Sequence, residues 1–182
     1  VRVGDVVVAS ALLQHDLDVS PLFPRHEVPG LGVSRLHPPA AWVAQVADAV
    51  ADALSPQALA PGGPLSHIHL DTLGLRAPRV HTGLIVSGDQ FVNSAEDADT
   101  LRHHLPDVLA VEMEGAAVAQ VCVAFGLPYA VVRTVSDRAD ASAHVDFERF
   151  VRSVASPYSL AIAMALLKVM PDGAVAAPQA HS

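Results

Sequence analysis

The sequence predicts an α/β fold with a mixed, largely parallel central sheet flanked by helices. Short apolar runs typical of buried strands alternate with segments of helical periodicity along the chain. Hydrophobic residues make up 51% of the chain and aromatic residues only 4%. A core of small aliphatic side chains suits helices packed on a sheet better than an aromatic-rich β-sandwich.

The first half of the chain contains one predicted strand and one predicted helix. The turn at Gly4 and Asp5 leads into a buried strand over residues 6–9. A loop rich in Pro, His and Asp covers residues 14–32, and loops of this length in compact domains are often functional. Residues 38–55 read as an amphipathic helix opened by two prolines, and residues 55–78 as an irregular insertion.

The second half alternates regularly between strand and helix. Ser94 and Asp97 resemble a capping box, and Gly126 followed by Pro128 marks a helix end. Pro157 is expected to kink or break the last helix, which Asp146 caps. The expected elements are a strand over 79–87, a helix over 95–105, a strand over 108–113, a helix over 114–125, a strand over 128–135 and a helix from 146 to about 170. Residues 1–170 are expected to form one domain, followed by a disordered tail over 171–182.

Charge and cysteine content narrow the possible partners and location. The formal net charge is −8, and scattered arginines with a single lysine do not make the basic patch that nucleic acid requires. The lone Cys122 cannot form an intramolecular disulfide, which fits a reducing cytosol. No signal peptide opens the sequence, and the apolar stretch over residues 160–170 is too short to span a bilayer. We therefore expect a cytoplasmic protein that binds neither nucleic acid nor a membrane.

Polar clusters follow three of the predicted strands, at residues 87–93, 112–114 and 133–137. Ligands in sheets of this kind bind at the carboxyl ends of the strands. The sequence therefore predicts that the three clusters converge on one edge of the sheet and form a site there.

Within these clusters, three acidic residues are the strongest candidates for chemistry. Asp137 follows an apolar strand, and a partly desolvated carboxyl group there can act as an acid, although a turn or helix cap is the plainer interpretation. Glu112 and Glu114 would share a face of a regular strand, with Arg133 as the cation between them. Paired carboxylates can accept hydrogen bonds from a vicinal diol such as that of ribose, or one of them can cap the next helix.

Other residues are weaker candidates. Phe91, with the backbone of Val92, could hold a flat base, or it could simply pack in the core. His67 and His69 could share a face of a strand, but no cysteine or carboxylate cluster completes a zinc site. His15 with Asp16 could be a catalytic base in the Pro-rich loop. We therefore expect no metal and no cofactor.

Read together, the segments resemble the nucleoside phosphorylase/nucleosidase superfamily, and its methylthioadenosine/S-adenosylhomocysteine nucleosidase branch most of all. The resemblance covers most of residues 1 to about 170, and its motifs are specific in combination. They are Val-Gly-Asp-Val-Val-Val at 3–8, Gly-Leu-Ile-Val-Ser-Gly-Asp-Gln-Phe-Val-Asn at 83–93, Val-Glu-Met-Glu-Gly-Ala-Ala at 111–117, Val-Val-Arg-Thr-Val-Ser-Asp at 131–137 and His-Val-Asp-Phe at 144–147.

The resemblance implies a nucleoside phosphorylase-like fold, a small nucleoside substrate and hydrolysis of the N-glycosidic bond with release of adenine. Asp137 would protonate N7 of adenine with Ser136 orienting it, and Glu114 would bind the ribose hydroxyls, positioned by Arg133. Phe91 would stack on adenine while the Val92 backbone reads its edge, and the ribose and 5′-thio pocket would be lined by Met113 and Phe147. A homodimer is implied for the complete protein.

The sequence also departs from the family. The insertion at 55–78 is longer than this connection usually is, and the loop at 14–32 is unusual in its Pro and His content. The family's N-terminal part, with the glutamate that activates water, has no counterpart here, so we expect the 182 residues alone to be inactive. Alternatives are a purine or uridine phosphorylase, a futalosine hydrolase, and a non-catalytic nucleoside-binding domain.

Overall fold

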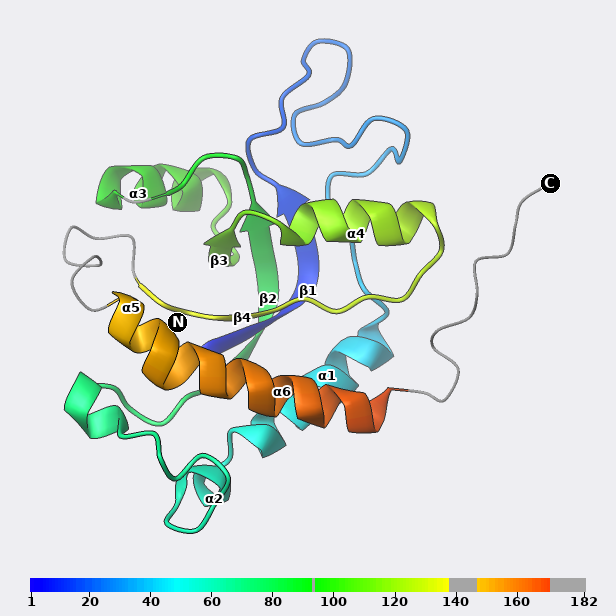
Figure 1. The fold of residues 1–182 in the computed structure, drawn as a ribbon. Helices are drawn as coiled ribbons and strands as arrows, with labels where there is room; N and C mark the ends of the chain where they lie inside the picture. The colour runs from blue at the N-terminus through cyan, green and yellow to red at the C-terminus, as the bar shows by residue number, and fades with distance from the viewer. Residues whose placement is uncertain (93, 138–146, 171–182) are drawn as a thin grey trace.

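The computed structural model describes residues 1–92, 94–137 and 147–170 (Figure 1). Its elements follow the predicted order closely. They are β1 (Val6–Gln14), α1 (Ala40–Ala53), α2 (Pro56–Leu59), a 3₁₀ turn at Leu70–Leu73, β2 (Val80–Ser87), α3 (Ala95–His104), β3 (Val108–Glu112), α4 (Gly115–Ala124), β4 (Val132–Thr134), α5 (Phe147–Phe150), a π-helical segment at Val151–Ala155 and α6 (Ser156–Val169).

The four strands form one sheet in the order β3-β2-β1-β4. β1 pairs in parallel with β2, placing Val6 opposite Val80, and β2 pairs in parallel with β3. β4 runs antiparallel to β1, with Val8 opposite Val132. The prediction of a mixed, largely parallel sheet is therefore confirmed, and Figure 1 shows the strands lying between α4 on one side and α1 with α6 on the other.

In the first half of β1, successive side chains alternate between the two core layers on either side of the sheet. Val6 and Val8 point into a cluster formed with α1 and α6, while Val7 and Ala9 point into a second cluster with α4. Successive side chains of a strand project to opposite faces, so a strand that is apolar throughout must be covered on both sides. The uninterrupted apolar run in the sequence thus fixes the three-layer arrangement.

A bulge in β1 then exchanges the two faces. The pairing with β2 shifts register between Ala9 and Ala11, and the carbonyl of Ser10 between them accepts a hydrogen bond from His37 Nδ1 at 3.0 Å. Beyond the bulge, Leu12 belongs to the α4 cluster, whereas Ala11 and Leu13 pack on the α3 side. One extra residue is enough for this, because the side-chain period of a strand is two.

The predicted helix ends are confirmed where the sequence carries capping chemistry. Ser94 Oγ accepts a hydrogen bond from the amide of Asp97 at 3.1 Å and opens α3. α4 ends at Ala124, and Gly126 follows its C-cap with a φ of +65° in the left-handed region. The amide of Leu127 donates to the carbonyl of Cys122 at 2.8 Å. The predicted cap at Asp146 lies outside the described residues.

The last helix is interrupted just before Pro157, as predicted. The π-helical segment ends at Ala155, and Pro157 has no amide to donate back to the preceding turn. The helical stretch Glu148–Val169 is long and apolar enough, by length and composition, to cross a membrane. Its inner side chains Val154, Tyr158 and Ile162 lie buried in the core shared with α1, while only 22% of its apolar window is buried.

The length of one predicted strand needs correction. The strand predicted over 128–135 is only three residues long, and it runs antiparallel. The apolar pattern of that segment reports burial, and Tyr129 and Val131 are indeed buried. Burial alone specifies neither the hydrogen-bonded length of a strand nor its direction.

Asp5 connects the start of β1 to the start of β2 through hydrogen bonds. Its buried carboxylate accepts hydrogen bonds from the amides of Arg2 and Arg79, each at 3.0 Å, and from His81 Nε2 at 2.9 Å. Burial by itself raises the pKa of Asp5, but the hydrogen bonds from His81, Arg79 and Arg2 outweigh it and hold the pKa below the ordinary value. The ionised carboxylate is therefore part of the folded structure.

We expect Asp5→Ala to lower the free energy of unfolding at pH 7 by about 3 kcal/mol, because it leaves three donors without an acceptor. Because the pKa of Asp5 is lower in the folded state, ionised Asp5 stabilises the fold at pH values above the ordinary pKa of 3.8. This stabilisation is lost as the pH falls through the pKa of the folded state. The gap between wild type and variant should therefore narrow at pH 3. Urea unfolding at both pH values measures it, with the exposed Asp48→Ala on α1 as control. Equal losses in the two variants would contradict this role of Asp5.

Candidate active site

A cavity of about 300 Å³ lies between β3 and the end of β4. It is lined along one side by residues 108–112 and along another by residues 133–137, with Ala98, Leu101 and Arg102 of α3 and Val1 completing the wall. Its volume is at the lower end of the range typical of small-molecule sites. Apart from Arg102, its polar lining residues come from two segments far apart in the sequence, residues 108–112 and 133–137.

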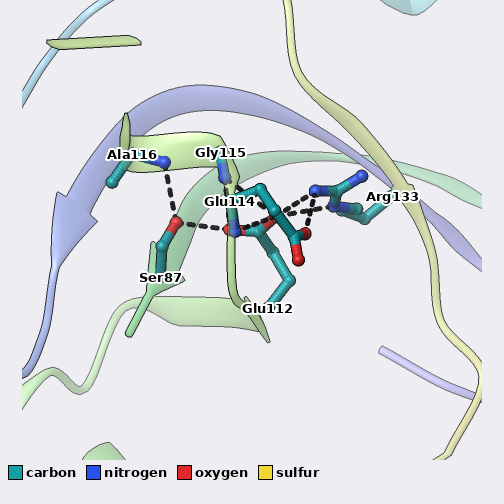
Figure 2. A network of polar contacts seen from close by, with 6 residues as sticks. All are labelled: Ser87, Glu112, Glu114, Gly115, Ala116 and Arg133. Atoms are coloured by element: carbon teal, nitrogen blue, oxygen red, sulfur yellow. Dashed lines mark hydrogen bonds and ion pairs between the residues drawn. The ribbon is translucent and has the colours of Figure 1, made fainter. Parts of the chain in front are cut away.

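Glu112, the last residue of β3, is the centre of the polar network beside this cavity (Figure 2). Its carboxylate accepts hydrogen bonds from Arg133 Nε at 2.8 Å and from the Gly115 amide at 2.8 and 3.0 Å. It also accepts from Ser87 Oγ, from Arg133 Nη2 and, at 3.2 Å, from the amide of Glu114. Both carboxylate oxygens are thus fully engaged within the protein.

Together Glu112 and Ser87 cap the N-terminus of α4. Ser87 ends β2, and its buried hydroxyl accepts a hydrogen bond from the Ala116 amide at 2.7 Å. The first amides of a helix have no partners within the helix, and a negative charge near them is stabilised by the helix dipole. At Gly115, the first residue of α4, a Cβ atom would lie 2.9 Å from Leu12 Cδ2 and 3.1 Å from Glu112 Oε1, so a larger residue would force these side chains to shift.

The pKa of Glu112 follows from this environment. Burial by itself raises it, but the hydrogen bonds from Ser87, Arg133 and Gly115 outweigh that effect and hold the pKa below its ordinary value. Glu112 is therefore an ionised structural acceptor. Of the two interpretations that the sequence leaves open, the helix cap applies to Glu112.

Arg133 joins the two glutamates, as the sequence predicts. Its Nη2 contacts Glu112 and also lies 3.1 Å from Glu114 Oε2. The side chain of Glu114 is 71% exposed, whereas that of Glu112 is only 11% exposed. Glu114 consequently has acceptor capacity left for a ligand.

Asp137 lies on the wall of the same cavity as Glu112 and Arg133. Ser136 Oγ donates a hydrogen bond to Asp137 Oδ2 at 2.8 Å. The predicted convergence of three strand ends on one edge is wrong for β4, because an antiparallel strand ends beside the start of β1. Residues 108–112 and 133–137 nevertheless line one cavity, and Arg133 donates a hydrogen bond to Glu112 across it.

Among the described side chains, those of Glu114, Phe91, Val92 and Met113 are not part of the cavity lining. Phe91 is 63% exposed, and Met113 is also exposed at the turn between β3 and α4. Val92 is partly buried. Phe147 is the first residue of α5, but its side chain is outside the described part of the structure. Among the described residues no group of His, Cys, Asp or Glu could hold a metal ion.

Sequence reasoning missed the contribution of Ser87 and of α3. Ser87 stood in one of the polar clusters, and a hydroxyl at a strand end just before a glycine was the available signal. Ala98, Leu101 and Arg102 gave no signal, because a surface helix of mixed polarity does not indicate which of its faces borders a cavity.

Comparisons with known proteins identify the relatives of the chain. The phosphorylase superfamily model matches residues 1–168. The 5′-methylthioadenosine/S-adenosylhomocysteine nucleosidase of Haemophilus ducreyi is 37% identical over 166 residues, covering 91% of this chain and 61% of the relative. The enzyme of the same name from Geobacillus kaustophilus is 36% identical over 170 residues, covering 93% and 62%. The chain thus spans about three-fifths of the length of these relatives.

Solved structures give the same result. The Neisseria meningitidis 5′-methylthioadenosine/S-adenosylhomocysteine nucleosidase, in complex with methylthio-immucillin-A, is similar with a TM-score of 0.71 at 30% identity, covering 93% of this chain and 63% of that one. The Streptococcus pneumoniae MTA/SAH nucleosidase, in complex with 8-aminoadenine, has a TM-score of 0.70 at 30% identity, with the same coverage.

The network predicts a large difference between the two glutamates. Glu112→Gln replaces a charged acceptor of several hydrogen bonds with an amide, and should lower the free energy of unfolding by about 2 kcal/mol at pH 7. Glu114→Gln, the matched control, should change it by less than about 0.5 kcal/mol, because the exposed pair contributes little. Urea unfolding measures both, and similar losses would contradict the assigned roles. Because the pKa of Glu112 is depressed, its contribution should disappear as the pH falls below the ordinary value of 4.5.

Proposed function

Because this chain belongs to the phosphorylase superfamily, we propose that it is the larger part of a nucleosidase. The enzyme would hydrolyse the N-glycosidic bond of 5′-methylthioadenosine and S-adenosylhomocysteine and release adenine. The lining of one cavity by Glu112, Arg133 and the Ser136–Asp137 pair supports this most strongly. Arg133 also holds Glu114 beside this cavity. The names of the relatives favour hydrolysis over phosphorolysis and over futalosine as the substrate. A non-catalytic nucleoside-binding domain would bind adenine without turnover.

Asp137 is the proposed general acid. Protonation of N7 by its carboxyl group makes adenine a neutral leaving group, so that the bond from C1′ to N9 can break toward an oxocarbenium-like state that water captures. The hydroxyl of Ser136, 2.8 Å from Oδ2, is placed to orient the Asp137 carboxyl group. This role requires no metal or cofactor.

Glu114 is the proposed acceptor for the ribose hydroxyls. It is the more exposed of the two glutamates, and Arg133 at 3.1 Å sets its position. Glu112 would act on the substrate only through Arg133 and the start of α4, because its own oxygens are already occupied. Although the sequence pairs Glu112 with Glu114 as a possible ligand of the ribose diol, we propose Glu112 only as a positioning residue.

The adenine and 5′ pockets would take their walls from the other predicted residues. Phe91 would stack on the base, with the Val92 backbone reading its edge, and Met113 and Phe147 would line the ribose and the 5′ substituent. Phe91 is exposed and does not line the cavity, so in this proposal it would cover the base from outside the cavity wall. We further propose that residues 1–170 form one domain, and that the protein is cytoplasmic and works as a homodimer.

The acid role predicts a specific kinetic defect in Asp137→Asn. The assay uses the chain joined to the part of the Haemophilus ducreyi nucleosidase outside the matching 61%. Adenine release from methylthioadenosine should fall by about 10²- to 10⁴-fold, the usual contribution of general acid catalysis, while adenine affinity changes far less. Asp48→Asn, at an exposed aspartate on α1 outside the site segments, is the matched control. Near-normal turnover in the Asp137 variant would remove this residue from the mechanism.

If Glu114 binds the ribose hydroxyls, the loss of activity caused by Glu114→Gln should depend on the substrate. Loss of the charge that accepts from the 2′- and 3′-hydroxyls should reduce kcat/KM for the ribonucleoside more than for its 2′-deoxy analogue, since the analogue lacks one of the two donors. Steady-state adenine release from both substrates measures the ratio. An equal loss for both would show that Glu114 does not read the 2′-hydroxyl.

A further inference from the structure

A second cavity, separate from the candidate active site, lies between the 55–78 segment and the last helical stretch, residues 147–169. It has a volume of about 430 Å³ and shares no lining residue with the first cavity. Its polar lining residues are all capable of donating hydrogen bonds: His67, His69, Thr72, Arg149, Arg152 and Ser153. No aspartate or glutamate is among them, although acidic residues outnumber Lys and Arg by 19 to 11 in the chain.

Burial of Ile68 fixes the position of the neighbouring His67 and His69. Ile68 is buried in the core cluster with Phe150 and Val154 of the last helix. His67 lies in a turn, and the side chains of His67 and His69 are exposed on either side of the buried Ile68, so the two imidazoles face away from the core. Thr72 Oγ1 donates to the His69 carbonyl at 2.8 Å and fixes the backbone at this point.

The last helix contributes the arginines from one of its faces. Arg149, Arg152 and Ser153 are three and four residues apart, which places them on the side opposite the buried Phe150 and Val154. Arg152 and Ser153 belong to the π-helical segment, and such segments are rare and frequent at functional sites. The interruption caused by Pro157 thus coincides with the cavity.

The chemistry of this lining selects an anion. Metal cations need carboxylates or a set of several metal-ligating side chains. No carboxylate lines this cavity, and its two histidines do not form such a set. A cleft lined by one sign of charge concentrates ligands of the opposite sign, and the arginine fork fits phosphate oxygens. The nearby Glu148 pairs with Arg152 at 3.6 Å, but both side chains are more than 80% exposed. An exposed pair of this kind is weak, so Arg152 can exchange it for a ligand.

We propose that this cavity is a binding site for a small phosphate-bearing anion, a phosphate monoester or a diphosphate. Arg149 and Arg152 bind its oxygens, and the imidazoles of His67 and His69 donate from the opposite wall. The site is separate from the nucleoside cavity and does not depend on the proposed nucleosidase activity.

Calorimetric titration of the 182-residue chain with sodium pyrophosphate and with sodium phosphate tests the site. We expect saturable binding, tighter for pyrophosphate, that weakens as salt is added. Arg152→Gln should reduce the affinity for pyrophosphate about tenfold or more, because it removes charge-assisted hydrogen bonds. Arg25→Gln is the matched control, since Arg25 is also exposed and pairs with an acid, Asp18, at 3.9 Å. Absent binding, or an equal loss in the two variants, would overturn the proposal.

A second measurement locates the ligand independently of those variants. Pyrophosphate should shift the imidazole NMR signals of His67 and His69, assigned through His67→Gln and His69→Gln. The adjacent pair His103 and His104 on α3 serves as an internal reference and should not shift. Shifts confined to histidines other than His67 and His69 would place the anion elsewhere and overturn the assignment.

Discussion

One carboxylate, that of Glu112, holds together the parts of the structure that surround the candidate active site. It receives hydrogen bonds from the end of β2, the start of α4 and a side chain of β4, while itself ending β3. Three strands and a helix are thereby fixed relative to one another at a single point. The cost of burying this charge is offset only because every oxygen is paired, which makes the network interdependent.

Glu112 and Glu114 illustrate how the environment, rather than residue type, assigns a role. They are two positions apart and contact the same arginine, yet one is sequestered by donors and the other faces solvent. The sequence identified the pair and its cation correctly. It could not decide which glutamate caps the helix, because that depends on where β3 ends, and strand ends are set by pairing with β2.

The same limit explains the other differences between expectation and structure. Features encoded by neighbours in sequence, such as the Ser94 cap, the Gly126 helix end and the break before Pro157, were predictable because their chemistry is local. The antiparallel direction of β4 depends on contacts between distant segments, which leave only a pattern of burial in the sequence. Family resemblance suggested the proposed roles of Asp137 and Phe91, which position and residue type alone leave ambiguous.

The bulge at Ser10 has a consequence for how the length of β1 can vary among related chains. Because the strand exchanges its two faces there, removing or adding one residue on either side of Ser10 would send Leu12 and Leu13 into each other's layers. Changes of length inside this strand are therefore far less tolerable than substitutions between aliphatic residues. A gap in an alignment of such chains should fall outside β1, or remove the bulge together with a compensating rearrangement of both helix layers.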